Sequence, residues 1–477
     1  MSPRPHFLVL TFPFQGHIAP ALRLARRLLA AAPDALVTFS TTDVAHRRMF
    51  PSKHPTEDAA VERGNDDDDD GRLEFLPFSD GTEAGYVRSS DKGSFNAYMV
   101  SFHAEGARSV GELLDALAAR GRPVSRVVYT LLLPWAADVA RERGVPSALY
   151  WIQPAAVFAI YHHYFHGHAG VVDEHRHDPS FAVQMPGLPP QAIEDLPSFI
   201  SESTDPSDPL HSCFTTLRDL FDTLDRESPR ATVLVNTCHE LEVDALAAVG
   251  AYDVLPVGPV LPSGHEAGLF KRDDAKYMEW LDSKPPNSVV YVSFGSLAAM
   301  EKEQLDELLL GLEESGRPYL CVVRKDMKLA VLAEAKVEID EGVKTGMVVE
   351  WCDQVGVLSH IAVGCFVTHC GWNSVLESLA CGVPMVGVPR LSDQRMNAQL
   401  VERDWRVGVR AEVDSNQGVL RSTELKRCIE EVMGKGEAAA EMQRMAMEWK
   451  EVVREALEKE GSSDRNLMAF VSGAWSC

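Results

Sequence analysis

The chain has 477 residues, which is enough for two or three domains that each hold a hydrophobic core. Its hydrophobic content of 45% and charged content of 24% are ordinary for a globular enzyme. The net charge of −24 argues against nucleic acids and anionic membrane surfaces as partners, because phosphate-rich surfaces attract basic patches. Nine scattered cysteines without a CxxC pair favour a reducing, cytoplasmic environment over a disulfide framework.

The first half of the chain alternates strand and helix patterns. Residues 7–12 predict a strand, residues 19–31 an amphipathic helix and residues 36–40 a second strand. Such a βαβ opening is typical of a parallel, doubly wound sheet. Further strands are predicted at residues 73–76, 126–129, 147–151 and 232–236.

Residues 145–172 contain no Asp, Glu, Lys or Arg, which invites a membrane interpretation. Pro146, Pro154 and several histidines argue against it, so we expect no stable membrane insertion. Within this stretch His162 and His166 stand at i and i+4, the spacing of a metal pair. No acidic third ligand lies at a useful spacing, and a half-exposed polar helix face is our preferred interpretation.

Residues 65–70 read NDDDDD, which contains the D-x-D spacing that some enzymes use to hold a divalent metal. Five successive aspartates repel one another, and a solvated loop is the preferred interpretation. We therefore predict no metal requirement and no cofactor.

Residues 255–275 are rich in proline and glycine and lack periodicity, and we predict a linker there. It separates a first domain, residues 1–254, from a second, residues 276–459. The second domain is predicted to hold strands at residues 289–293, 319–324, 347–350, 365–368 and 384–388, and the tail two helices at residues 438–460 and 466–471.

The most informative segment is residues 351–394, WCDQVGVLSHIAVGCFVTHCGWNSVLESLACGVPMVGVPRLSDQ. A short strand ends at His369, and a helix then opens at Gly371. A helix start offers backbone N–H groups and a partial positive charge, which suit a diphosphate. Asn373 and Ser374 add side-chain donors, and Glu377 lies one turn further on the same face, where a carboxylate can accept from both ribose hydroxyls.

The next strand ends just before Asp393 and Gln394, whose side chains suit sugar hydroxyls. In an open parallel sheet, ligands bind beyond the carboxyl ends of the strands, so this pair and His369 are expected to face one crevice. Earlier in the same domain, residues 289–296 read VVYVSFGS, a strand and a tight turn. Gly295 allows close approach of a phosphate, and Ser296 is a candidate donor to it.

The segment resembles the signature of the plant family of UDP-dependent glycosyltransferases that act on small molecules. The resemblance assigns Trp351 to the uracil ring, Gln354 and Glu377 to the ribose, His369, Asn373 and Ser374 to the diphosphate, and Trp372, Asp393 and Gln394 to the sugar. Cys352 and Gly371 complete the predicted donor site. A merely structural strand-helix-strand unit would explain the apolar residues of the segment but not these polar ones.

The resemblance extends over essentially the whole chain and implies the GT-B fold: two facing Rossmann-like α/β domains with a cleft between them, and a last helix, within residues 460–477, that returns to the first domain. The stretches YTLLLPWAADVARERGVPSALYWIQP and MPGLPP look most like the branch that holds crocetin and anthocyanin 5-O-glucosyltransferases. Two positions depart from the family pattern: Asp353 replaces a common proline and Leu391 a common tryptophan. Both changes bear on the packing of the sugar pocket.

His17 stands at the mouth of the first helix, in LTFPFQGHIAPALR. A cationic imidazolium is disfavoured at the positive end of a helix, so His17 is expected to be neutral and ready to accept a proton. The alternative is a helix-capping histidine without chemistry. The resemblance places the catalytic base of the family at His17.

Where the family often carries an aspartate that orients this histidine, the chain reads VVYTLLLPW with Thr130. A hydroxyl stabilises an imidazolium less than a carboxylate does, so we predict a weaker base, helped by Thr130 or by an unidentified carboxylate. Such an enzyme favours acceptors that ionise easily: a carboxylic acid with a pKa of ~4.5 is already deprotonated at neutral pH. Acidic phenols come next and aliphatic alcohols last.

The acceptor pocket is predicted to be apolar, although each of its residues can equally be ordinary core. Its candidates are Phe14, Leu131, Pro134, Trp151 and Gln153. We predict a monomer that transfers glucose, with inversion, from UDP-glucose to a small lipophilic metabolite, preferably a carboxylic acid. O-glucosylation of a flavonoid or anthocyanin hydroxyl is the alternative, and an inactive UDP-sugar-binding sensor is the alternative from another class.

Overall fold

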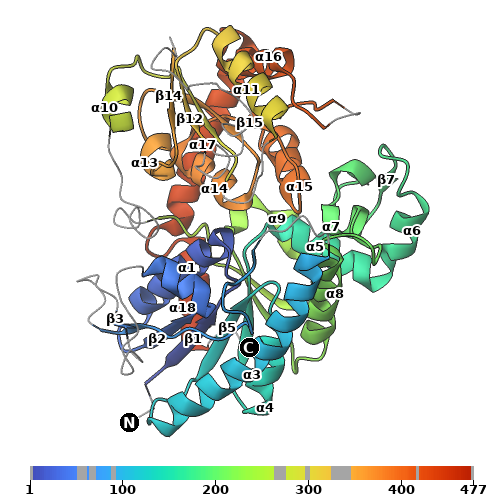
Figure 1. The fold of residues 1–477 in the computed structure, drawn as a ribbon, viewed down its shortest axis with the longest axis vertical. Coiled ribbons are helices and arrows are strands. Elements are labelled where there is room, and N and C mark those ends of the chain that lie inside the picture. Colours follow the sequence, from blue (N-terminus) through green and yellow to red (C-terminus); the bar gives the residue numbers. More distant parts are fainter. Residues whose placement is uncertain are drawn as a thin grey trace. The chain divides into compact units, whose positions relative to one another are not determined.

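The computed structural model describes residues 4–50, 62–63, 71–87, 93–262, 276–295, 301–323, 345–414 and 418–473. The chain forms two compact units, which are described one at a time (Figure 1). The first unit comprises Met1–Leu261 together with Ala456–Cys477, and the second comprises Pro262–Glu455.

The first unit is built on an eight-stranded sheet in the order β10-β9-β6-β5-β1-β2-β4-β3. All neighbours are parallel except β3 and β4. The central strand β1 reads HFLVL and is buried along its whole length, as expected of a parallel strand covered on both faces. The strands are β1 (His6–Leu10), β2 (Leu36–Ser40), β3 (Glu62–Arg63), β4 (Leu73–Phe75), β5 (Arg126–Thr130), β6 (Ser147–Trp151), β9 (Thr232–Val235) and β10 (Asp253–Pro256).

The strand order reverses at β1, because β2 lies on one side of it and β5 on the other. Right-handed crossovers that run in opposite directions along a sheet cover opposite faces, so α1 and α4 lie on opposite faces. The helices of this unit are α1 (Gln15–Ala31), α2 (Asp43–Met49), α3 (Ser94–Ala119), α4 (Trp135–Glu142), α5 (Ala155–His163), α6 (Ala169–Glu174), α7 (Ser198–Ser201), α8 (His211–Asp225), α9 (Val243–Ala247) and α18 (Ser462–Ser472). A small hairpin pairs β7 (Ala182–Val183) with β8 (Gln191–Ala192).

The last helix, α18, belongs to the first unit and packs beside α1 and β10 (Figure 1). The ring of Phe470 lies 6.2 Å from the ring of Phe7 in β1. The guanidinium of Arg126 lies over the Phe470 ring, 4.8 Å from its centroid. Asn466 donates a hydrogen bond to the carbonyl of Pro256 at 2.9 Å. The C-terminal residues therefore complete the core of a domain that begins at the opposite end of the chain.

The second unit is built on a six-stranded parallel sheet in the order β13-β12-β11-β14-β15-β16. Its order reverses at β11, between β12 and β14. The strands are β11 (Val289–Ser293), β12 (Tyr319–Val322), β13 (Gly346–Val349), β14 (Val363–Thr368), β15 (Met385–Gly387) and β16 (Gly408–Arg410). The helices are α10 (Lys276–Asp282), α11 (Lys302–Glu314), α13 (Gln354–Leu358), α14 (Trp372–Cys381), α15 (Gln394–Gln399), α16 (Ser422–Met433) and α17 (Glu437–Leu457).

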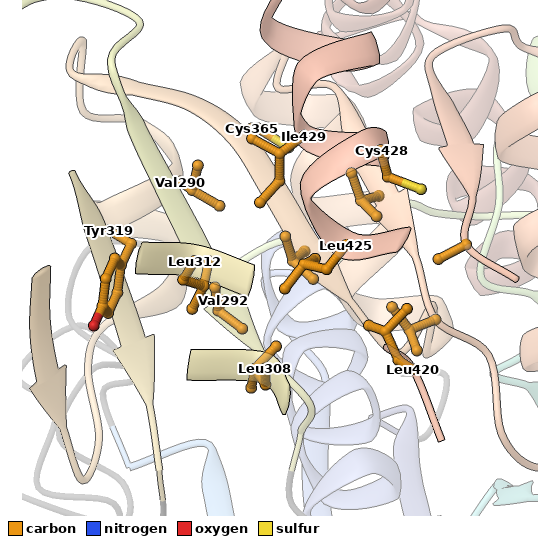
Figure 2. Close-up of a cluster of buried hydrophobic side chains, with 14 of the residues drawn as sticks. Val290, Val292, Leu308, Leu312, Tyr319, Cys365, Leu420, Leu425, Cys428 and Ile429 are labelled. Atoms are coloured by element: carbon orange, nitrogen blue, oxygen red, sulfur yellow. The ribbon is translucent and has the colours of Figure 1, made fainter. Parts of the chain in front are cut away.

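One face of this sheet is covered by α11 and α16, and the hydrophobic cluster between them forms a core (Figure 2). Val290 and Val292 of β11 meet Leu308 and Leu312 of α11, and all four side chains are buried. Figure 2 shows Leu425 and Ile429 of α16 directed toward the strands from the same side. This packing fixes the strand ends from which the site residues extend.

The predicted strands all form, with ends that differ by at most two residues, and five further strands, β3, β7, β8, β10 and β16, were not predicted. Leu255 and Pro256 were predicted to begin the linker, but they end β10. Proline is compatible with this place because β10 is an edge strand, where a missing N–H leaves no ladder bond unmade. The three-residue strand β16 is too short to give a periodic signal. Residues 65–70 lie outside the described residues.

None of the helices that the structure describes is long and apolar enough to cross a membrane. The uncharged residues 145–172 are divided among β6, α5, a π-helical turn at Tyr164–His168 and α6. No single element uses the whole apolar stretch.

Candidate functional site

The carboxyl end of β14 and the start of α14 form the centre of the candidate site in the second unit. Gly371 is the N-cap residue of α14, and Gly382 ends the helix in the left-handed conformation, with φ of 73°. The helix is therefore bounded by the two glycines, as predicted. His369 lies between strand and helix at the β11/β14 reversal of the sheet, where ligands of open α/β sheets bind.

Two glycines make room for the imidazole of His369. A Cβ atom on Gly371 would lie 2.4 Å from its Nε2 atom, and a Cβ atom on Gly295 would lie 2.7 Å from its Cε1 atom. Gly295 also has φ of +71°, a conformation that other residues rarely adopt. Burial lowers the pKa of His369 to about 4, so the ring is neutral at physiological pH. The two glycines therefore leave space for a neutral His369 imidazole, which can donate or accept a hydrogen bond at the start of α14.

A polar network joins the predicted ribose residues. Gln354 donates through Nε2 to the Ser374 hydroxyl at 3.1 Å and to the Glu377 carboxylate at 2.8 Å. Ser374 and Glu377 are both buried, on one face of α14. The Gln354 carbonyl accepts from the hydroxyl of Tyr291 in β11 at 3.2 Å, and the same hydroxyl lies 3.3 Å from the Cys352 sulfur. The structure thus brings Cys352, Gln354, Ser374 and Glu377 together.

Asp393 and Gln394 begin α15, beside the start of α14. Asp393 is buried, and burial raises its pKa to about 6 although a hydrogen bond from Asn397, at 2.7 Å, favours the charged form. The same amide nitrogen of Asn397 donates to the carbonyl of Cys370 at 2.8 Å. The Gln394 carbonyl accepts from the backbone N–H groups of Arg390 and Leu391 at 2.9 and 3.1 Å. Asn397 therefore links the Asp393 carboxylate to the turn that carries His369.

The remaining predicted donor residues surround this centre. Trp351 is half-buried, ahead of α13, and Asn373 is half-buried in the first turn of α14. Trp372 is only 3% exposed, and its ring packs against Trp405 at 6.0 Å, so the indole serves the core and its sugar contact stays a prediction. Ser296 lies outside the described residues.

Strained backbone marks three of these turns. Six described non-glycine residues have positive φ, and Cys370 and Ser392, with φ of 59° and 62°, stand beside the donor-side residues. Leu132, with φ of 71°, follows β5 beside Thr130. Such conformations concentrate where ligands bind, because the surrounding packing must hold them against their strain. Cys370 follows β14 and Leu132 follows β5, each beside the strand at which its sheet reverses its order, whereas Ser392 follows β15.

His17 lies in the first turn of α1, at the carboxyl end of β1. Its Nδ1 atom is buried and has no hydrogen-bond partner among the described residues. Burial alone lowers the pKa of His17 to about 4. The ring is therefore neutral, as predicted, and in the described part of the chain no carboxylate holds its Nδ1 atom.

Thr130 is fully buried at the end of β5, next to β1. Its hydroxyl donates to Thr11 and accepts from the backbone N–H of Phe12, both at 3.4 Å. These bonds link the ends of β1 and β5. Since the hydroxyl is engaged there, any influence of Thr130 on His17 passes through the backbone of residues 11–14.

An aromatic cluster lies beside His17. Phe12 is 5.3 Å from the His17 ring and 4.8 Å from Phe14. Phe14 in turn contacts Tyr86 at 6.2 Å and Phe95 of α3 at 6.4 Å. Sequence reasoning identified only Phe14 of this cluster; Tyr86 and Phe95 come from segments far from it in the chain.

The other acceptor candidates differ in their surroundings. Leu131 and Pro134 are buried in the turn after β5, and Gln153 is half-buried after β6. Trp151 is completely buried, packs against Phe158 at 5.2 Å and donates to the carbonyl of Pro154. Trp151 is thus part of the core of the first unit.

No group of three metal-ligating side chains is found among the described residues. His162 and His166 do stack, with ring centroids 4.2 Å apart, and the Nε2 atom of His166 lies 3.0 Å from a carboxylate oxygen of Asp225. This acidic neighbour belongs to α8 and could not be identified from local spacing. His166 is exposed, but its backbone angles, φ of −107° and ψ of 43°, are not helical, so it does not lie on the predicted helix face.

Tyr291 and Asn397 were not identified from the sequence. The tyrosine lies in the middle of a largely apolar strand, VVYVS, and the asparagine stands four residues after Asp393, one turn away on a helix. Both signals are visible in hindsight but are common in proteins. Only their contacts distinguish them from ordinary buried polar residues.

Comparisons with known proteins agree with this geometry. The family described as UDP-glucoronosyl and UDP-glucosyl transferase matches residues 258–446. The chain is 44% identical to crocetin glucosyltransferase of Gardenia jasminoides, over 98% of this chain and 97% of the relative. It is 41% identical to anthocyanidin 3-O-glucoside 5-O-glucosyltransferase 1 of Perilla frutescens, over 98% of both chains.

Solved structures share the fold over the full length. The crystal structure of Os79 from O. sativa in complex with UDP superimposes with a TM-score of 0.79 at 31% identity, covering 99% of this chain and 100% of that one. UDP-glucose: anthocyanidin 3-O-glucosyltransferase in complex with UDP gives a TM-score of 0.82 at 25% identity, covering both chains completely. The predicted fold class, two Rossmann-like domains of the GT-B type, is confirmed. The chain belongs to the plant family of UDP-dependent glycosyltransferases that act on small molecules.

Proposed function

We propose that this glycosyltransferase transfers glucose from UDP-glucose to the carboxylate of a small lipophilic acid and so forms a glucose ester. The observation that carries the proposal is the state of His17, a buried and neutral imidazole whose Nδ1 atom has no partner among the described residues. Without a neighbouring carboxylate, the imidazolium that proton abstraction would create gains little stabilisation. An acceptor that is already ionised does not need that step.

On the donor side, the start of α14 stabilises the negative charge that develops on the leaving diphosphate. Backbone N–H groups at a helix start, together with His369, Asn373 and Ser374, suit this charge. Glu377 and Gln354 hold the ribose, Asp393 and Gln394 the glucose hydroxyls, and Trp351 the uracil. Cys352, Gly371, Trp372 and Ser296 complete the proposed donor site. Binding energy from these groups orients the anomeric carbon toward the acceptor.

The reaction is a single displacement. A carboxylate oxygen of the acceptor forms a bond to the anomeric carbon of glucose, the bond from that carbon to the diphosphate oxygen breaks, and UDP leaves with the electron pair. The configuration at the carbon inverts. For a hydroxyl acceptor, His17 would accept the proton, and the low basicity of its buried ring disfavours that route. The aromatic cluster around Phe12 and Phe14 offers flat apolar faces to the body of the acceptor.

The alternative acceptor is a phenolic hydroxyl. Its support is the set of relatives, which includes phloretin 4'-O-glucosyltransferase of Malus domestica at 40% identity besides the anthocyanidin enzymes. An acceptor panel of acids and phenols, followed by mild alkali, separates the two: an ester is cleaved and a phenolic glucoside largely resists. Release of UDP without any glucosylated acceptor would instead indicate hydrolysis of UDP-glucose. Binding of UDP without turnover would indicate a sensor.

Thr130→Asp tests the role of the missing carboxylate. A carboxylate near the end of β5 is expected to raise the pKa of His17 and to shift preference from acids toward alcohols. An unchanged rate and unchanged preference would contradict the argument from a weakened base. Thr130→Val is the control, because it keeps the volume and removes the bonds to Thr11 and Phe12 without adding charge.

We further propose a monomeric enzyme of the cytosol that needs no metal or cofactor besides its UDP-sugar. The relative from Gardenia jasminoides carries the description chloroplastic, so the compartment needs a direct test. Imaging of the chain fused to a fluorescent protein at its C-terminus distinguishes cytosol from plastid. Size-exclusion chromatography with light scattering measures the oligomeric state.

A further inference from the structure

Tyr291 lies outside the signature segment, in the middle of β11, yet its hydroxyl contacts two residues of the proposed donor site. It is 3.2 Å from the Gln354 carbonyl oxygen and 3.3 Å from the Cys352 sulfur. Its side chain is 1% exposed, and its ring stacks on Phe366 of β14 with centroids 4.9 Å apart and planes 20° apart. The ring is held by two strands, so the position of the hydroxyl is fixed by the sheet.

The hydrogen bonds of this hydroxyl determine how the Gln354 amide is oriented. A phenol has one proton, and Tyr291 donates it to the Gln354 carbonyl. The Cys352 thiol then supplies the proton in its own contact with the Tyr291 oxygen. With its carbonyl held, Gln354 must direct its NH₂ group toward Ser374 and Glu377, at 3.1 and 2.8 Å. The opposite orientation would set the amide carbonyl against the Glu377 carboxylate.

We infer that Tyr291 is a positioning residue for ribose recognition, acting through Gln354 on the carboxylate of Glu377. The inference rests on the proposed donor site, in which Glu377 accepts from the ribose hydroxyls. A buried carboxylate held by an amide keeps one orientation, and a carboxylate that rotates loses the directional bonds that tell a ribose from a deoxyribose. Tyr291 would therefore set nucleotide selectivity without touching the nucleotide.

The test compares the binding of UDP and 2'-deoxy-UDP by isothermal titration calorimetry. Tyr291→Phe keeps the ring and its stacking on Phe366 and removes only the hydroxyl. Loss of one hydrogen bond to the network is expected to weaken UDP about three- to tenfold. Binding of 2'-deoxy-UDP should change less than about twofold, because it lacks a hydroxyl that the network would hold. In steady-state assays KM for UDP-glucose should rise while kcat stays the same.

Tyr319→Phe is the matched control. Tyr319 is equally buried, on the neighbouring strand β12, and its hydroxyl donates to Glu313 at 2.8 Å, away from the ribose network. This variant should keep the wild-type ratio of the two dissociation constants, even where its melting temperature falls. Equal loss of UDP and 2'-deoxy-UDP binding in Tyr291→Phe would reveal a purely structural role and overturn the inference.

Two further outcomes separate this inference from the proposed function. A wild-type protein that does not prefer UDP over 2'-deoxy-UDP would refute the proposed ribose contact itself, whatever Tyr291 does. Should Tyr291→Phe fail to fold, Gln354→Met tests the same link, since it keeps the length of the side chain and removes the amide. Retained preference for UDP in that variant would overturn a role of Tyr291 through Gln354.

Discussion

Asp393 is expected to lower the stability of the free protein at neutral pH while it strengthens donor binding. Burial raises the pKa of its carboxyl from 3.8 to about 6. A carboxyl with a raised pKa is destabilising above its folded pKa, and this cost disappears as the pH falls toward 3.8. The ionised form costs on the order of 3 kcal/mol at pH 7.5 and roughly half of that at pH 5.

Asp393→Asn isolates this effect, because other titrating groups, including His17 and His369, contribute equally to both proteins. Denaturant unfolding without ligand is measured for wild type and variant at both pH values. At pH 7.5 the variant should be more stable than the wild type, and this difference in unfolding free energy should fall to roughly half at pH 5. A stability difference that does not change with pH would refute the reasoning from burial.

The same titration acts in the opposite direction on the donor. In the proposed donor site the ionised carboxylate accepts hydrogen bonds from sugar hydroxyls, and at pH 5 only about a tenth of a group with this pKa is ionised. Binding of UDP-glucose to the wild type should therefore weaken about tenfold between pH 7.5 and pH 5. Asp393→Asn should bind weakly at both values. Equal pH dependence in the two proteins would show that another group is responsible.

Three further predictions concern the surroundings of the site. Gly295→Ala should weaken UDP binding by more than about tenfold, because the new methyl group would lie 2.7 Å from the His369 ring. Gly316→Ala is the control: it has a similar φ of +66° and nothing within 4 Å, so it should cost about 1 kcal/mol of stability and leave UDP binding intact. Equal UDP affinities in the two variants would exclude a steric effect on His369. Asn397→Ala removes the hydrogen bond that Asn397 donates to Asp393, so the pH midpoint at which UDP-glucose binding is lost should rise from about 6. The dissociation constant of UDP-glucose measured as a function of pH gives this midpoint. An unshifted midpoint would argue against this bond. Activity should survive excess chelator undiminished, and a loss that manganese restores would contradict the absence of a metal step.

The parallel sheets were predictable because buried parallel strands are continuous apolar runs between helical patterns. Val289–Ser293 and Leu36–Ser40 were predicted residue for residue. The edge strands were harder: Asp253–Pro256 contains a proline and Gly408–Arg410 has three residues, and neither gives a period. Edge positions tolerate such sequences because only one side of the strand is paired.

Most residues of the proposed donor site lie within one segment of the chain, so sequence patterns alone could group them. Gln354 begins α13, and Ser374 and Glu377 lie on α14, and hydrogen bonds join the three side chains. Tyr291 reaches them from a separate strand, and no spacing rule connects it to Gln354. The surroundings of His17 depend on Phe12, Tyr86 and Phe95, which only tertiary packing brings together.

The claim that a neutral, unassisted His17 restricts the enzyme to ionised acceptors is tested most directly with cinnamic acid and cinnamyl alcohol, which share one apolar frame. UDP release and product formation are followed for both at saturating UDP-glucose between pH 5.5 and 8. The account predicts kcat/KM at least about tenfold higher for the acid, with an alkali-labile product. Preference for the alcohol, or an acid rate that rises with pH as a group of pKa near 6.5 ionises, would contradict it.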